Sequence, residues 1–70
     1  MMPLTMIKPG AEASIKKVGG REETRQFLAN LGFTPGTRVS IITEISGNVI
    51  VSIKESRVAV SQEMAAKIFF

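Results

Sequence analysis

The sequence predicts a small, mainly β domain built as a strongly bent antiparallel sheet or partly open barrel, with one inserted helix. Apolar and polar residues alternate through residues 38–53, and glycine or proline separates the short runs from one another. Only residues 21–31 have the spacing of an amphipathic helix. Because 70 residues support a single core, we expect residues 1–70 to form one domain.

The first predicted strand runs from Glu12 to Val18. It follows the turn signal Pro9-Gly10, and apolar residues alternate from Ala11, just before the strand, through Ala13 and Ile15. Two glycines at positions 19 and 20 then interrupt the chain, so we expect the strand to end there.

The predicted helix over residues 21–31 carries its apolar side chains on one face, at Phe27, Leu28 and Leu31. Two glutamates in its first turn suit the positive end of the helix dipole, and Gly32 suits a left-handed cap at its other end. We expect the three apolar side chains to cover an open part of the sheet's core.

A β-hairpin is predicted after the helix. The tetrapeptide Thr34-Pro35-Gly36-Thr37 is typical of a type II turn, and it leads into a strand over residues 38–45. The alternation of that strand predicts one face with Val39, Ile41, Thr43 and Ile45 and another with Arg38, Ser40, Ile42 and Glu44. The turn signal at residues 46–48 then leads into the partner strand, residues 49–54.

The last part of the chain predicts short elements. A polar turn over residues 54–57 precedes the apolar run at 58–60, and Ser61 is a good N-cap for a helical turn over about 61–66. The closing run Ile68-Phe69-Phe70 is apolar throughout. Because a strand alternates its faces, one phenylalanine of this run is expected to be exposed.

Composition excludes several classes of function. The chain has no cysteine and no histidine, and also no aspartate and no tyrosine, so we find no nucleophile with a recognisable base and expect no enzyme. The six glutamates are scattered, which predicts no metal site and no cofactor. No run of about 20 apolar residues and no signal peptide is present, so a cytoplasmic protein is expected.

The stretch FLANLGFTPGTRVSII resembles the helix, the Leu-Gly and Pro-Gly turns and the following strand of the FeoA family. Upstream, LTMIKPGAEASIKKVGG resembles that family's leading strand and loop, and downstream GNVIVSIKESRVAVSQEMAAKIF resembles its hairpin and last strand. Two departures are Lys54-Glu55-Ser56, where the family often has a glycine, and Val60, where a leucine is frequent.

This resemblance implies an SH3-like β-barrel that acts as a noncatalytic cytosolic accessory protein of bacterial ferrous iron uptake. It further implies binding to the cytosolic GTPase-bearing region of the FeoB transporter, with an effect on that partner's assembly or nucleotide cycle. Contact with the membrane is expected only through the partner.

Candidate partner-binding residues fall into three groups. The basic side chains could meet an acidic surface, although a solvated helix face is the simpler interpretation. Ile42 and Ile50 form either a cross-strand apolar patch or a second core layer. Phe33 either packs back on the helix or docks a partner, and the terminal phenylalanines could serve docking or strand addition, with fraying of the chain end or self-association as the alternatives. The complete set is Phe33, Arg21, Arg25, Arg38, Ile42, Ile50, Phe69 and Phe70.

Two other functions stay open at this stage. A nucleic-acid-binding SH3-like module could use the basic residues on phosphates, and the net charge of +3 allows this. The four phenylalanines are not interleaved with those residues, however, so no nucleic acid is expected. The fold also resembles the SH3-like domain of iron-dependent repressors, which is joined to a DNA-binding segment that this chain lacks.

Overall fold

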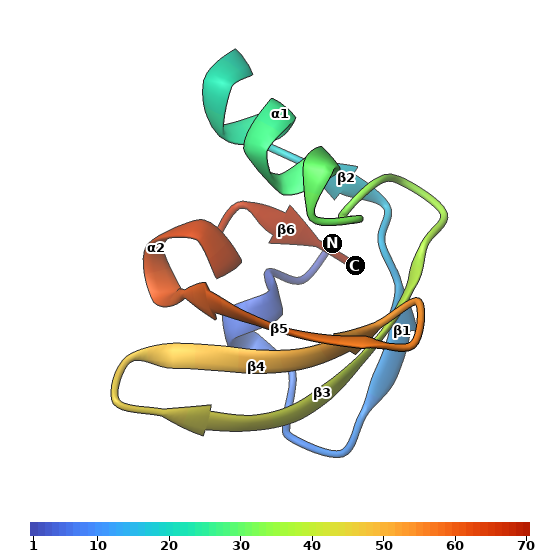
Figure 1. The fold of residues 1–70 in the computed structure, drawn as a ribbon, viewed down its shortest axis with the longest axis vertical. Helices are drawn as coiled ribbons and strands as arrows, with labels where there is room; N and C mark the ends of the chain where they lie inside the picture. The colour runs from blue at the N-terminus through green and yellow to red at the C-terminus, as the bar shows by residue number, and fades with distance from the viewer.

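The computed structural model describes all residues 1–70 and contains two antiparallel sheets (Figure 1). The larger sheet has the order β1-β3-β4-β5, with β1 (Glu12–Ser14), β3 (Arg38–Ile45), β4 (Asn48–Ile53) and β5 (Ser56–Ser61). The smaller sheet pairs β2 (Lys17–Val18) with β6 (Ile68–Phe69). Three helical segments complete the fold, namely η1 (Leu4–Met6), α1 (Glu22–Asn30) and α2 (Gln62–Ala65). The predicted mainly β fold with one inserted helix is confirmed.

The predicted strand over residues 12–18 is wrong in one respect, because it divides into β1 and β2. The two residues between these strands form backbone hydrogen bonds with different parts of the chain. The Ile15 N–H donates to the Thr37 carbonyl (2.9 Å), and the Lys16 N–H donates to the Phe69 carbonyl (2.8 Å). The chain therefore leaves one sheet and enters the other within two residues. This corner bends the fold toward a barrel without closing it.

The β3–β4 hairpin is confirmed, but half of the predicted face assignment in β3 is wrong. Ile41 pairs with Val51 and Thr43 pairs with Ile50, so one extra residue, Ile42, forms a β-bulge. A bulge shifts the alternation by one position. Val39 and Ile41 share one face as predicted, and that face is buried, whereas Thr43 and Ile45 move to the opposite face and Ile45 becomes 57% exposed.

Helix α1 ends in a Schellman motif. The Phe33 N–H donates to the Leu28 carbonyl and the Gly32 N–H donates to the Ala29 carbonyl, both at 2.9 Å. Gly32 has the positive φ, 106°, that this cap needs. Leu28 and Phe33 are both buried, and this is the hydrophobic contact that accompanies the motif. The expectation that Phe27 covers the core is wrong, because its side chain is 49% exposed.

Helix α2 begins as predicted. Ser61 is its N-cap, and the Met64 N–H donates to the Ser61 hydroxyl at 3.3 Å. This helix returns the chain from β5 to β6, so that Ile68 enters the core as a fully buried residue. The buried core contains 13 apolar residues, drawn from both sheets, the helices and the turns. No helix in the structure has both the length and the apolar character needed to cross a bilayer.

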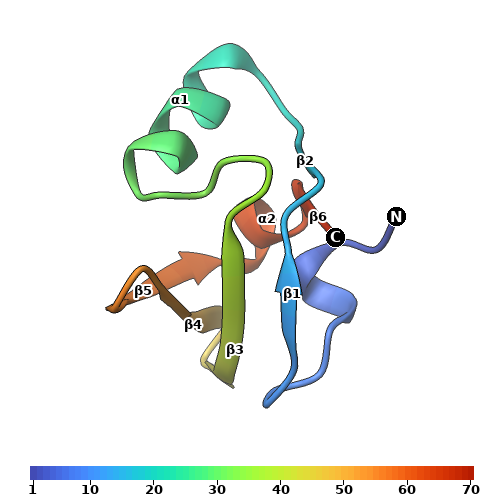
Figure 2. The same ribbon diagram turned by 90° about the vertical axis from the view of Figure 1, so that its right-hand side faces the viewer.

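Strand β6 lies between two neighbours, with β2 on one side and the start of the chain on the other. Met2 and Phe70 exchange two backbone hydrogen bonds, at 2.9 and 2.8 Å, and Pro3 forms a bridge with Phe69. The N- and C-terminal residues therefore lie side by side, on the same side of the molecule as β2 (Figure 2).

Candidate docking surfaces

The structure separates the candidate residues by burial. Phe33 is 1% exposed and Phe70 is 9% exposed, so neither side chain is available to a partner. Phe33 serves the helix cap described above, and Phe70 belongs to the core. Phe69 and Ile50 are half-buried, and the exposed members of the set are Arg21, Arg25, Arg38 and Ile42.

An apolar strip crosses the outer face of the larger sheet near the β3–β4 turn. It consists of Ile42, Ile45, Ile50 and Ala59, and we call these four residues the hairpin patch. Ile50 pairs on one side with Ala59 and on the other with Thr43, which lies between Ile42 and Ile45 along β3, so the strip extends over three strands with Thr43 inside it. Ile42 is 37% exposed at the bulge. The patch interpretation of Ile42 and Ile50 therefore fits the exposure of Ile42 better than a second core layer does.

Ile45 is the member of the hairpin patch whose face the sequence pattern predicted wrongly. Simple alternation along β3 placed it on the face of Val39 and Ile41, and only the bulge at Ile42 turns it outward. A local sequence pattern contains no signal for this bulge, because the bulge is a property of the pairing between β3 and β4. Two consecutive isoleucines in an otherwise alternating strand are the only local sign of the irregularity.

A polar row borders the hairpin patch on the same face. Glu12 pairs in register with Ser40, Ser40 with Ser52, and Ser52 with Arg57, so the row crosses all four strands. The side chains alternate with the buried positions of each strand, which places them toward solvent. The outer face of the sheet thus has one apolar zone and one polar zone.

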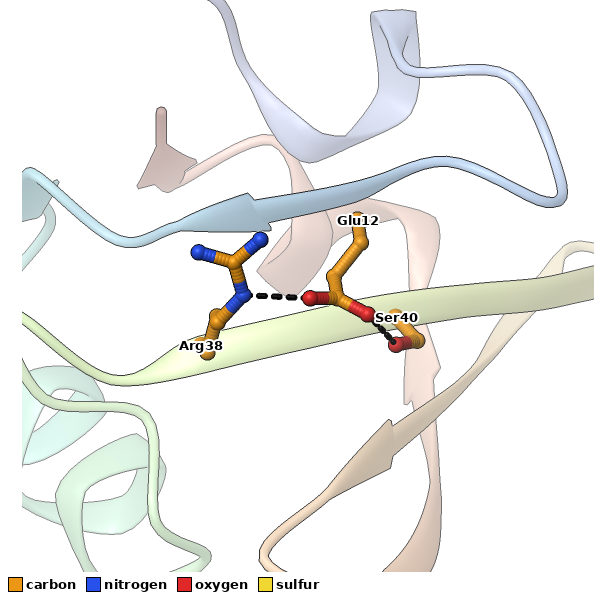
Figure 3. Close-up of polar contacts among 3 residues, drawn as sticks. All are labelled: Glu12, Arg38 and Ser40. Atoms are coloured by element: carbon orange, nitrogen blue, oxygen red, sulfur yellow. Dashed lines mark hydrogen bonds and ion pairs between the residues drawn. The ribbon is translucent and has the colours of Figure 1, made fainter.

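Arg38 is already engaged within this face. Its guanidinium Nε donates to one carboxylate oxygen of Glu12, and the Ser40 hydroxyl donates to the other at 3.2 Å (Figure 3). The hydrogen bond from Arg38 lowers the pKa of the Glu12 carboxyl, with smaller contributions from the Ser40 hydrogen bond and the positive charge of Arg38. Because β1 and β3 are neighbours, this group holds the sheet edge together and leaves Arg38 less available to an acidic partner.

The C-terminal run does not offer the open strand edge that strand addition requires. Both edges of β6 are occupied, by β2 and by Met2 and Pro3. Only the side chain of Phe69 remains partly accessible, on the outer face of the smaller sheet. The sequence alone could not reveal this, because the pairing joins the two ends of the chain.

Arg21 and Arg25 lie near the start of α1, where the Arg25 N–H donates to the Arg21 carbonyl at 2.9 Å. Neither side chain forms an ion pair, and both are exposed. Figure 1 shows α1 standing away from the larger sheet, so these arginines and the hairpin patch belong to different parts of the surface. The candidate residues therefore do not form one site.

Comparison with known proteins agrees with this fold over nearly the whole chain. The FeoA domain family model matches residues 2–70. A protein of Methanocaldococcus jannaschii named Fe(2+) transport protein A is 34% identical over 68 residues, covering 97% of this chain and 83% of that protein. The crystal structure of an iron uptake regulatory protein (FeoA) superposes with a TM-score of 0.88 at 25% identity, over 96% of this chain and 91% of the other.

The fold also recurs in a larger protein. A manganese-dependent transcriptional repressor superposes with a TM-score of 0.85, covering 94% of this chain and 38% of the repressor, at 17% identity. At that identity the similarity concerns the fold alone. The family model and the relative that is 34% identical carry the assignment, and the chain belongs to the FeoA family.

Proposed function

We propose that this protein is a noncatalytic accessory protein of ferrous iron uptake that acts in the cytoplasm. It binds the cytosolic GTPase-bearing region of a FeoB-type transporter and affects that partner's assembly or nucleotide cycle. Its family membership and a relative named for Fe(2+) transport support the iron-transport role. The partner itself comes from the resemblance of the sequence to that family.

The hairpin patch is the observation that supports docking through this chain. Isolated exposed apolar residues are ordinary on a protein surface, but an apolar strip over adjacent strands is typical of a contact site. Ile42, Ile45 and Ile50 lie on paired strands. Binding would therefore order few groups of this surface, and the loss of conformational entropy would be small. The polar row beside the patch supplies a hydrated rim.

A titration of isotope-labelled protein with the isolated GTPase domain of the transporter tests this proposal. Backbone amide shifts would be followed with and without bound nucleotide. We expect saturable shifts centred on β3, β4 and β5 around the hairpin patch. Nucleotide-dependent shifts would support an effect on the nucleotide cycle, whereas the same shifts in both states would favour an assembly role.

A pair of variants makes the test specific to the surface. Ile45→Lys places a charge in the hairpin patch, and we expect it to weaken binding by about tenfold or more, as loss of a central apolar contact does. Met6→Lys is the matched control, because Met6 is 64% exposed and lies outside the patch. Equal affinity of both variants would contradict docking through this patch, and no shifts at high partner excess would contradict the choice of partner.

A further inference from the structure

The outer face of the β2–β6 sheet differs in chemistry from the hairpin patch. Ile68 is fully buried and Val18 packs against the core, and these two residues are paired. Side chains alternate along strands, so the neighbouring pair Lys17 and Phe69 faces outward. Pro3, which bridges Phe69 from the other side, extends this outer face toward the start of the chain.

Two glycines shape the surface around Phe69. The Gly19 N–H donates to the Lys67 carbonyl at 2.7 Å, and Phe69 Cε2 lies 3.5 Å from the place where a Cβ on Gly19 would sit. Lys67 Cδ lies only 2.7 Å from the corresponding place on Gly20. The aromatic ring and the lysine stem therefore lie close against a backbone without side chains. The Lys67 stem is packed, while its ammonium group can reach water.

Phe69 has basic neighbours: Lys17 pairs with it across the sheet, and Lys67 precedes it by two residues on β6's side of the sheet. Lys16 precedes Lys17 and is exposed, and Arg21 follows the glycine pair at the start of α1. The one ion pair of the structure lies elsewhere, between Glu12 and Arg38, so these cations are unpaired. Residues 13–21 and 64–70 contain no acidic side chain, and the acidic residues that border these two segments are Glu12, Glu22 and Glu63. The basic-aromatic face consists of Pro3, Lys17, Lys67 and Phe69, and the exposed cations Lys16 and Arg21 lie close to it along the chain.

We propose that the basic-aromatic face binds the surface of a lipid bilayer that contains anionic phospholipids. Lysine and arginine side chains are attracted to anionic head groups, and each one near the surface strengthens binding about fivefold, the equivalent of about 1 kcal/mol. Phe69 and Pro3 give the same face a small apolar centre for the head-group region. This combination of a basic rim and an apolar centre is the chemistry of a peripheral membrane contact.

The arrangement fits a bilayer better than a nucleic acid. Binding of a single strand needs successive aromatic platforms along a basic groove, whereas this face offers one half-buried phenylalanine with the cations grouped around it. The smaller sheet also lies away from the β3–β4 turn, near which the hairpin patch is found (Figures 1 and 2). Contact with a bilayer would therefore leave the hairpin patch free, and it needs no transporter.

Vesicle co-sedimentation tests the proposal on the full chain without any transporter present. The probes are vesicles of phosphatidylcholine alone and vesicles in which phosphatidylglycerol replaces half of it. We expect binding to the anionic vesicles only. That binding should weaken as salt rises, because the Debye length shrinks from about 30 Å at 0.01 M to about 8 Å at 0.15 M.

Two double variants separate the face from net charge. Lys17→Glu with Lys67→Glu changes the basic-aromatic face, and Lys54→Glu with Arg57→Glu makes the same change of four charges on the β4–β5 hairpin. Removing two cations at about fivefold each predicts at least a ~25-fold loss for the first variant. The second should keep most of its binding. Amide spectra of both variants confirm that each is folded.

Three results would overturn the proposal. These are equal losses in the two double variants, equal binding to the two kinds of vesicle, and no binding to anionic vesicles at low salt. One further result would contradict the proposal: the unaltered protein does not bind vesicles but binds a single-stranded oligonucleotide in a salt-dependent way, and the Lys17/Lys67 variant loses that binding. The transporter-domain titration with the same variant keeps the two proposals distinct, since that variant leaves the hairpin patch intact.

Discussion

The turn between β4 and β5 holds two residues in an unusual backbone conformation. Lys54 has φ 46° and Glu55 has φ 68°, and Ile53 pairs with Ser56 across them, which defines a two-residue hairpin loop. Such loops favour asparagine and glycine, because other residues pay about 1–2 kcal/mol for a left-handed conformation.

Replacing this turn should therefore stabilise the protein. We expect Lys54→Asn with Glu55→Gly to raise the free energy of unfolding by about 1–2 kcal/mol, as measured by urea denaturation. The control is Ser46→Asn in the β3–β4 turn, where Ser46 has φ 48° but Gly47 already occupies the second position. A larger gain from the control variant would contradict this account of the turn.

The Glu12–Arg38 pair predicts a specific pH dependence. The pKa of Glu12 is lowered in the folded protein, chiefly by the hydrogen bond from Arg38. The pair therefore stabilises the fold above the unfolded-state pKa of this carboxyl, and the contribution is lost as pH falls through the lower folded-state pKa. Because both side chains are exposed, the effect on stability should be small.

The carboxyl resonance of Glu12, followed during an NMR titration, measures this effect directly. We expect Arg38→Gln to raise the pKa of Glu12 toward its ordinary value. The free energy of unfolding should then fall less steeply as the pH is lowered into the acid range. Ser40→Ala, which removes the second hydrogen bond to the Glu12 carboxylate, should cause a smaller rise in the pKa. A pKa that does not change in Arg38→Gln would show that the pair does not form in solution.

At the scale of elements, the local patterns predicted most of the structure. The β3–β4 hairpin, the Gly32 cap and the Ser61 N-cap each depend on residues close together in sequence, and all three are present. The division of residues 12–18 into two strands was missed, because Ile15 and Lys16 bond to segments far along the chain. The bulge at Ile42 was missed for the same reason, since it is defined by the partner strand.

Helix α1 offers a test of which side chains attach it. Leu28 is fully buried, whereas Phe27 is about half exposed, although both are apolar and adjacent. We expect Leu28→Ala to cost about 2–5 kcal/mol and Phe27→Ala less than about 0.5 kcal/mol. Urea denaturation measures both values, with Leu28→Val as the milder change if Leu28→Ala does not fold. Equal losses would mean that Phe27 covers the core after all.

At the scale of the whole molecule, the candidate docking residues were harder to predict than the fold. The hairpin patch depends on a bulge, and the basic-aromatic face depends on Lys17, Lys67 and Phe69 meeting across the β2–β6 sheet. Both are products of pairing between distant segments. Phe33 and Phe70 illustrate the opposite case, because conspicuous apolar residues that could have served a partner are used by the core.

The pairing of the two ends of the chain makes the last prediction. Deleting Met2 and Pro3 removes the two hydrogen bonds exchanged between Met2 and Phe70 and the bridge from Pro3 to Phe69. We expect a loss of about 1–3 kcal/mol, at roughly 1 kcal/mol per hydrogen bond. The deletion also opens one edge of β6, and an open edge with apolar side chains favours pairing between copies.

Sedimentation velocity measures the second effect, and urea denaturation measures the first. The deletion variant should sediment increasingly as a dimer when its concentration rises, more so than the unaltered protein. Replacement of Met1 by alanine is the control, because Met1 is 76% exposed and no backbone hydrogen bond ties it to β6. Unchanged stability and unchanged sedimentation in the deletion variant would contradict the role of residues 2 and 3 as the segment that covers this edge of β6.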